Sequence, residues 1–97
     1  MSFKDIVTAD MRLVILRVLE QDADYSHNEY VLQRALEQLG HSVSTDRLRT
    51  ELRWLEEQGL IAINTGGVFV AQLTTRGADV AMGRARIDGV ARPRPGS

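Results

Sequence analysis

The sequence has no cysteine, and its only two prolines, Pro93 and Pro95, stand in the last five residues. The absence of cysteine excludes disulfide bonds, thiolate metal sites and a cysteine nucleophile. No apolar run approaches the roughly 18–20 residues that cross a bilayer, so we expect no membrane-spanning helix. The first residues lack the basic segment and hydrophobic stretch of a secretory signal, which indicates a cytoplasmic protein.

A large charge of either sign is also missing. The 97 residues carry 12 Lys and Arg against 13 Asp and Glu, a formal net charge of −1, whereas proteins that coat nucleic acid without sequence preference are usually basic. The charges are segregated, since residues 1–43 hold 4 basic and 7 acidic side chains and residues 75–97 hold 5 and 2. The near-neutral total is therefore a cancellation.

Length and composition indicate one domain. Domains typically hold roughly 100–150 residues, and 43% hydrophobic with 26% charged residues is an ordinary globular composition. The last seven residues read Ala-Arg-Pro-Arg-Pro-Gly-Ser, where the prolines and glycine prevent regular structure. We therefore expect a single domain over residues 1–86 and a flexible, basic tail over residues 87–97.

Helical periodicity predicts a first helix from about Thr8 to Gln21, with apolar residues that point nearly all round. A helix with so wide an apolar surface must be covered on more than one side. Either the other helices of the chain or a second subunit could provide that cover.

A helix-turn-helix pattern follows. Ser26 and Glu29 fit a capping box at the start of a second helix, in which each side chain bonds a backbone N–H near the other. Gly40 can adopt the left-handed conformation that ends a helix. Ser44 or Thr45 can cap a third helix after a connection of about four residues, which is the spacing of a helix-turn-helix motif.

Beyond Gly59 the pattern changes from helical to strand-like. Residues 60–64 and 68–73 are rich in β-branched and aromatic side chains, and the Asn-Thr-Gly-Gly run between them predicts a hairpin turn. A last helix is expected from Thr75 to about Arg86.

Two motifs resemble the winged helix-turn-helix family of DNA-binding domains. They are Leu48-x-x-x-Leu52-x-x-Leu55-Glu56-x-x-Gly59-Leu60-Ile61 and Leu73-Thr74-x-x-Gly77-x-x-x-Ala81. The first is similar to the end of the recognition helix in bacterial regulators of the arsenic-repressor and multiple-antibiotic-resistance types, and the second to their exit from the wing. With the helix-turn-helix pattern, the resemblance covers about residues 26–85. It implies an α+β, mainly α, winged helix-turn-helix fold with a three-helix core, a β-hairpin wing and a C-terminal helix.

The chain's size and its ending Gly-Val-Ala-Arg-Pro (residues 89–93) also resemble the small winged-helix proteins of Mu-like phages and prophages. Three features depart from the wider family. The alanine and glycine of the turn, Ala35 and Gly40, stand five apart rather than four, the wing tip has no Lys or Arg, and the metal-sensing cysteines are missing. Metal sensing is therefore not carried over.

The resemblance implies that the third helix enters the major groove of DNA. With Leu48, Leu52 and Leu55 facing inward, steps of about 100° per residue place polar side chains on the outer face. The candidate DNA-binding residues are Thr45, Asp46, Arg47, Arg49, Thr50 and Arg53 on this helix, Asn64 and Thr65 in the wing, and Arg92 and Arg94 in the tail.

A plainer interpretation of the same charges stays open. The pairs at helical spacing are Arg47 with Glu51, Arg53 with Glu57, and Asp46 with Arg49. Oppositely charged side chains three or four residues apart meet on any exposed helix. An ordinary solvated face would explain these residues almost as well as DNA recognition.

Catalytic and metal-binding chemistry has little support. His27 and His41 are the only histidines, and neither has carboxylates at a ligand or base spacing that repeats on one helical face. Gly66 and Gly67 join two predicted strands, whereas a phosphate loop joins a strand to a helix and ends in Lys-Ser/Thr. We therefore expect no enzyme, no cofactor and no metal ion.

Two functions follow as hypotheses. The first is a transcriptional regulator of phage or prophage origin that reads double-stranded DNA as a homodimer. The resemblance implies pairing through the first and last helices, with Met11, Ile15, Val18 and Val80 as candidate contacts. The alternative is a winged-helix adaptor that binds a phage protein in assembly or DNA packaging and does not read DNA. The uncharged wing and the acidic first half of the chain favour the adaptor.

Overall fold

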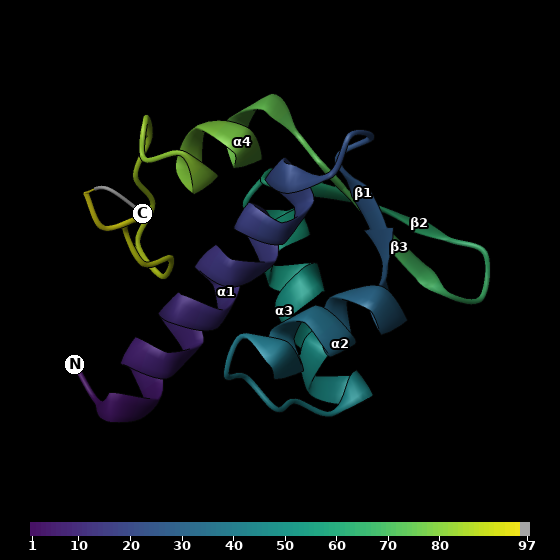
Figure 1. Cartoon of the computed structure of the whole chain (residues 1–97), viewed down its shortest axis with the longest axis horizontal. Helices are drawn as coiled ribbons and strands as arrows, with labels where there is room; N and C mark the ends of the chain where they lie inside the picture. The colour runs from purple at the N-terminus through teal and green to yellow at the C-terminus, as the bar shows by residue number, and fades with distance from the viewer. Residues whose placement is uncertain (96–97) are drawn as a thin grey trace.

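Four helices and three short strands make up residues 1–95, the part of the chain that the computed structural model describes (Figure 1). In order they are α1 (Phe3–Gln21), β1 (Ser26–Asn28), α2 (Glu29–Gln38), α3 (Thr45–Glu57), β2 (Ile61–Thr65), β3 (Phe69–Leu73) and α4 (Thr75–Ala81). The fold is α+β and mainly helical, and it is compatible with a winged helix-turn-helix. None of the helices in these residues is both long and apolar enough to span a membrane.

α1 begins at Phe3, five residues before the predicted start at Thr8. Ser2 caps it, because its Oγ accepts a hydrogen bond from Asp5 N at 3.1 Å while Asp5 Oδ2 accepts one from Ser2 N at 3.3 Å. This capping box satisfies backbone N–H groups that a helix start otherwise leaves free. The apolar pattern did not reveal these turns, because residues 1–6 are exposed and mark no buried face.

The capping box predicted at Ser26 and Glu29 is wrong. Residues 26–28 form β1, and Asn28 caps α2 by accepting a hydrogen bond from Val31 N at 2.9 Å. Several polar residues precede this helix, and spacing alone does not tell which of them turns its oxygen toward the free N–H groups. Glu29 is thereby available for contacts elsewhere in the chain.

The strands form one antiparallel sheet in the order β1–β3–β2. The predicted hairpin is confirmed, with Ile61 paired to Leu73 and Thr65 to Phe69. β1 was not predicted, since a three-residue strand is too short to show an alternating pattern. Because β1 pairs with β3 and leads directly into α2, the sheet holds the start of α2 beside the hairpin.

Apolar side chains from all four helices and the hairpin form one core. The largest fully buried ones are Ile15, Leu16, Leu19, Leu32, Leu36, Leu48, Leu52, Leu55 and Leu60. The wide apolar surface of α1 is thus covered by elements of the same chain.

This burial corrects the predicted dimer contacts. Met11, Ile15 and Val80 are each at most 3% exposed within one chain, and Val18 is half-buried against the same core. Side chains that are already packed inside a protomer offer no surface to a second one. Met11, Ile15 and Val80 therefore belong to the core of the folded chain and are not available as dimer contacts, whereas Val18 is partly exposed.

α4 ends at Ala81, five residues before the predicted end at Arg86. The helix stops where Gly83 takes a left-handed φ of +81°, a conformation that glycine adopts at little cost. Gly83 N donates to Val80 O at 3.1 Å and satisfies a carbonyl near the end of the helix.

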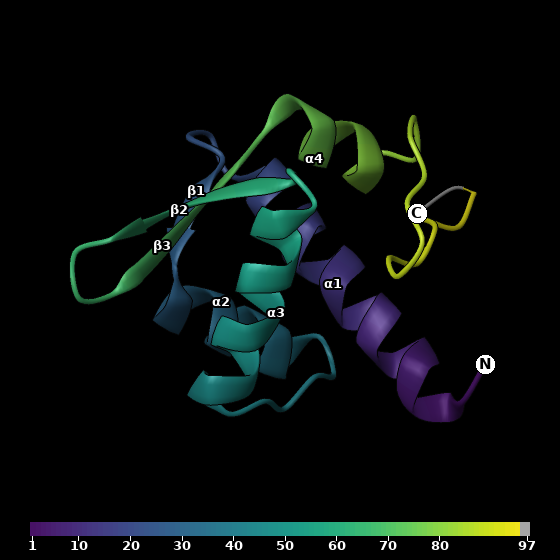
Figure 2. The same ribbon diagram turned by 180° about the vertical axis from the view of Figure 1, so that it is seen from behind.

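The C-terminal segment, residues 82–95, then returns along α1 (Figures 1 and 2). Ala91 N donates to Ala9 O at 3.1 Å, and Val90 is only 8% exposed. Residues 87–91 are therefore packed rather than part of a flexible tail, and the folded region extends past residue 86. The last two residues of the predicted tail, 96 and 97, lie outside the described residues.

Gly77 allows the closest backbone approach in the fold. A Cβ at this position would lie 2.0 Å from Leu60 O, a backbone atom that cannot move aside as a flexible side chain can. Gly77→Ala should lower the unfolding free energy by about 3 kcal/mol, the upper end of typical overpacking costs. Gly66 is the matched control, because a Cβ there meets nothing within 4 Å. Urea unfolding that showed similar losses for Gly66→Ala and Gly77→Ala would contradict this packing.

Candidate functional site

The outer surface of α3 and the adjoining hairpin form the candidate site, called here the α3–hairpin face (Figure 2). Ser44 caps α3 by accepting a hydrogen bond from Arg47 N at 3.0 Å. The leucines at positions 48, 52 and 55 are fully buried, as predicted. The opposite side of the helix exposes Asp46, Thr50 and Arg53, as the helical spacing indicated.

A buried carboxylate joins α3 to the hairpin. Glu29, at the start of α2, is 1% exposed and receives both arms of Arg49: Nε donates to Oε1 at 2.7 Å and Nη2 to Oε2 at 2.8 Å. Glu29 Oε2 also accepts from the backbone N–H of Phe69 at 2.6 Å. Arg49 Nη2 reaches Gly67 O at 3.4 Å. We call these contacts the Glu29 clamp, since they hold α2, α3 and β3 together.

The Glu29 clamp shifts the titration of its carboxyl. Hydrogen bonding from Arg49 is the main cause of the lowered pKa of Glu29, burial opposes the shift, and Phe69 N–H adds to it. The same pairing raises the pKa of Arg49. Glu29 is thus kept as a carboxylate in the folded protein.

A second buried carboxylate holds Arg47 away from the face. Glu51 is 4% exposed, accepts from Arg47 Nε at 2.9 Å, and accepts from Arg12 Nε of α1 at 2.6 Å. The predicted Arg47–Glu51 pair is therefore confirmed, with the carboxylate buried and the arginine partly exposed. Arg12 also lies 3.7 Å from the centre of the Trp54 ring and donates to Gly89 O at 3.1 Å, which connects α3 to the C-terminal segment.

Arg53 is the arginine of α3 that has no buried carboxylate as its partner in residues 1–95. It is about half exposed, pairs with Glu56 at 2.9 Å rather than with the predicted Glu57, and lies 4.6 Å from the centre of the Phe69 ring. Exposed pairs of this kind contribute little, typically about 0–1 kcal/mol. Arg53 can therefore turn to a ligand, whereas Arg49 cannot without exposing Glu29.

The remaining predicted residues lie in three places. Asn64 and Thr65 are exposed on β2, in the hairpin that the Glu29 clamp holds to α3. Thr45 is half-buried, and its Oγ1 lies 3.5 Å from Gln33 Oε1. Arg92 and Arg94 lie in the C-terminal segment, which both views place at the opposite end of the molecule from the hairpin (Figures 1 and 2). They do not join the α3–hairpin face.

Each histidine pairs with an aspartate outside its own element. The partner of His27 lies just after α1, and the partner of His41 lies within α1. His27 Nε2 lies 2.6 Å from Asp22 Oδ2, and His41 Nε2 lies 2.7 Å from Asp10 Oδ2. Spacing on one helix could not reveal these pairs. No group of three or more potential metal-ligating side chains gathers within residues 1–95.

Sequence reasoning missed the role of Glu29. Its capping-box spacing suggested a local role, and Asp46 was the expected partner of Arg49. The actual partners, Arg49 and Phe69, stand 20 and 40 residues further along the chain. No periodic pattern connects residues at such separations, so only the fold could reveal this pairing.

Fold and face together define a small, mainly helical α+β protein with a hairpin clamped beside one helix. The chain is 52% identical over 92 residues to the uncharacterized protein gp26 of Escherichia phage Mu, which covers 94% of this chain and 95% of that protein. It is 49% identical over 78 residues to an uncharacterized protein of Haemophilus influenzae, with 78% and 76% covered. The chain therefore belongs to the family of phage Mu gp26. No model of a known protein family matches it.

The predicted relation to phage proteins is confirmed by this membership. The resemblance to winged-helix regulators stays a prediction.

Replacing the buried carboxylate tests the Glu29 clamp. Glu29→Gln should lower the unfolding free energy by about 1–3 kcal/mol at neutral pH, because the charge-assisted bonds to Arg49 are lost. Since the folded pKa lies below the unfolded value, the stabilisation is present above about pH 4.3 and is lost as the pH falls through the folded pKa. Urea unfolding at several pH values should therefore show a weaker acid dependence in Glu29→Gln.

The control is Glu37→Gln, an exposed carboxylate on the same helix. It removes the same charge but none of the Glu29 clamp. An equal change in acid dependence for both variants would contradict the role of Glu29.

Proposed function

We propose that the protein is a winged-helix DNA-binding regulator of phage type that reads duplex DNA with its α3–hairpin face. The observation that carries the proposal is the Glu29 clamp, which fixes a hairpin beside the exposed side of α3. The element order helix–strand–helix–helix–hairpin and the sheet order β1–β3–β2 support a winged helix. α3 has 13 residues and is about 20 Å long, and the major groove, about 12 Å wide, admits one helix.

The contact set differs from the one expected from the sequence. Arg53, Thr50 and Asp46 are exposed on α3 and are the proposed base-edge or phosphate contacts, with Asn64 and Thr65 on the hairpin. Arg47 and Arg49 instead position the face, because each is bound to a buried carboxylate. Substituting Arg49 would therefore destabilise the domain by leaving Glu29 buried without its partner, so it is not a clean test of DNA contact.

Arg53 offers the clean test. Arg53→Ala should leave the fold intact, because the side chain is exposed, and should weaken DNA binding about tenfold, the loss expected for one arginine–base contact. Arg84→Ala is the matched control: Arg84 is exposed, pairs with Asp79 and follows α4, away from the face. Binding is measured by fluorescence anisotropy on fragments of the genome that encodes the protein, at several salt concentrations.

Affinity should fall steeply with salt, as counterions are released from each contacted phosphate. Absence of binding at about 50 mM salt, or equal losses for Arg53→Ala and Arg84→Ala, would contradict DNA recognition by this face.

A protein-binding adaptor is the second candidate, and two observations favour it. Within residues 1–95, every arginine of α3 contacts a carboxylate, and the hairpin has no Lys or Arg. The apolar residues Tyr30 and Val68, next in sequence to Glu29 and Phe69 of the clamp, are exposed. Aromatic and arginine side chains together are typical of protein interfaces.

Site-directed crosslinking separates the two candidates. The chain has no cysteine, so Thr50→Cys creates a single thiol on the α3–hairpin face for a photoreactive label. During phage growth, the DNA proposal expects adducts that nuclease removes, and the adaptor expects adducts that protease removes. Thr75→Cys, exposed at the start of α4, is the control position and should give neither adduct in quantity.

A further inference from the structure

The first turns of α1 project past the other helices (Figure 1). Several of their apolar side chains are exposed. Phe3 is 80% and Ile6 52% exposed, and Met1 is fully exposed. Three of the nine large apolar side chains that are exposed in residues 1–95 thus lie within the first six residues. Exposed apolar groups that gather in one place mark an interaction surface, whereas scattered ones do not.

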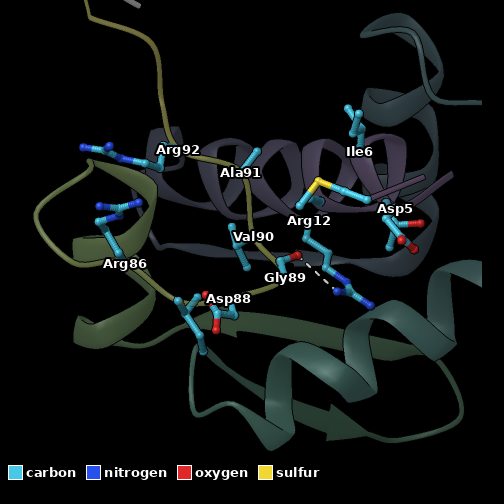
Figure 3. A pocket seen from close by; sticks show the side chains of 13 residues that line it. Asp5, Ile6, Arg12, Arg86, Asp88, Gly89, Val90, Ala91 and Arg92 are labelled. Atoms are coloured by element: carbon cyan, nitrogen blue, oxygen red, sulfur yellow. Dashed lines mark hydrogen bonds between the residues drawn. The ribbon is translucent and has the colours of Figure 1, made fainter. Parts of the chain in front are cut away.

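An open groove of about 710 Å³ runs between this part of α1 and the C-terminal segment (Figure 3). Its apolar lining consists of Ile6 and Ala9 from α1 and of Ile87, Val90 and Ala91 from the segment. Met1 and Ile6 are exposed and also line this groove, which we call the α1 groove, whereas Phe3 lines a separate hollow beside the turn between α2 and α3.

Opposite charges lie at the two ends of the α1 groove. Figure 3 shows Asp5 at one end, with Arg86 and Arg92 at the other. Asp88 lies on the same segment and offsets only part of the arginines' charge, so the segment keeps a net positive charge. Arg12 also lines the groove, but Glu51 and Gly89 O already hold it.

We propose that a second copy of this chain occupies the α1 groove in a two-fold symmetric dimer. In such an interface both copies use the same surface. If one residue of the first copy contacts another residue of the second copy, the reverse contact is also made. The occupant must bring exposed apolar groups together with negative charge. The start of α1 carries both, in Met1, Ile6 and Asp5.

Rotation about the two-fold axis sets Asp5 of each copy against Arg86 and Arg92 of the other, and Ile6 against the apolar lining. The segregation of acidic charge early in the chain and basic charge late in the chain makes this surface self-complementary. The α1 groove replaces the buried residues first expected to pair the subunits.

Charge reversal tests the proposal. In an Asp5→Arg homodimer, arginines would face arginines, and in an Arg86→Asp/Arg92→Asp homodimer, carboxylates would face carboxylates. Each variant alone should dissociate at least about tenfold more readily than the wild type, since like charges across an interface are strongly unfavourable. Mixing the two variants should restore dimers, because both sets of contacts in the heterodimer pair opposite charges.

Sedimentation velocity measures the dimer, and native mass spectrometry identifies the mixed species by its mass. Asp24→Arg, the same charge change at an exposed position outside the groove, is the control and should dimerise like the wild type. Asp5→Arg also removes part of the Ser2 capping box, but fraying of α1 would not be reversed by a partner variant, so rescue on mixing is specific to the charge pairing.

Ile6→Glu adds an apolar test and should disrupt dimers, whereas Val31→Glu, an exposed apolar position on α2, should not. A wild-type protein that stays monomeric at about 0.1 mM, or variants that do not recover on mixing, would overturn the proposal. The groove and the hairpin lie at opposite ends of the molecule, and the dimer is measured without DNA. A failure of the dimer proposal can therefore be distinguished from a failure of DNA binding.

Discussion

The carboxylate of Glu29 is the interaction on which the α3–hairpin face depends. A buried charge persists in a folded protein only when it is paired and hydrogen-bonded. Glu29 achieves this with Arg49 from α3 and the backbone N–H of Phe69 from β3. Because its partners come from two other elements, the carboxylate keeps its hydrogen bonds only when α2, α3 and the hairpin hold their relative positions. A two-stranded hairpin alone is at best marginally stable in water, so the clamp and β1 together give it a fixed place.

The same pairing decides which arginines of α3 are bound to a buried carboxylate. Arg47 and Arg49 turn toward Glu51 and Glu29, and only Arg53 remains loosely held. A helix with three arginines therefore presents less positive charge than its sequence suggests. Any recognition by this face depends on few charges and on shape, while the C-terminal segment, which carries four arginines, lies at the other end of the molecule (Figure 2).

Elements whose signals are local could be predicted. α2, α3 and the hairpin were located correctly, because leucine periodicity, Gly40 and the Asn-Thr-Gly-Gly turn act within a few residues. Features that depend on remote contacts could not be predicted. β1 exists because β3 pairs with it, and residues 87–91 are ordered because α1 and Trp54 receive them. At the site, the exposure of Asp46, Thr50 and Arg53 followed from helical geometry, but the engagement of Arg49 did not.

The sequence was enough to locate two helices joined by a short turn, the hairpin that follows them, and charges divided between the two ends of the chain. Periodicity and turn chemistry are properties of neighbouring residues, so they can be read without a fold. Which arginines of α3 are structural becomes clear only in the folded chain, because Glu29 and Glu51 are buried by elements far apart in the sequence. The tertiary structure alone also brought the acidic start of α1 and the basic C-terminal segment to one groove, since that placement depends on how the chain returns after α4.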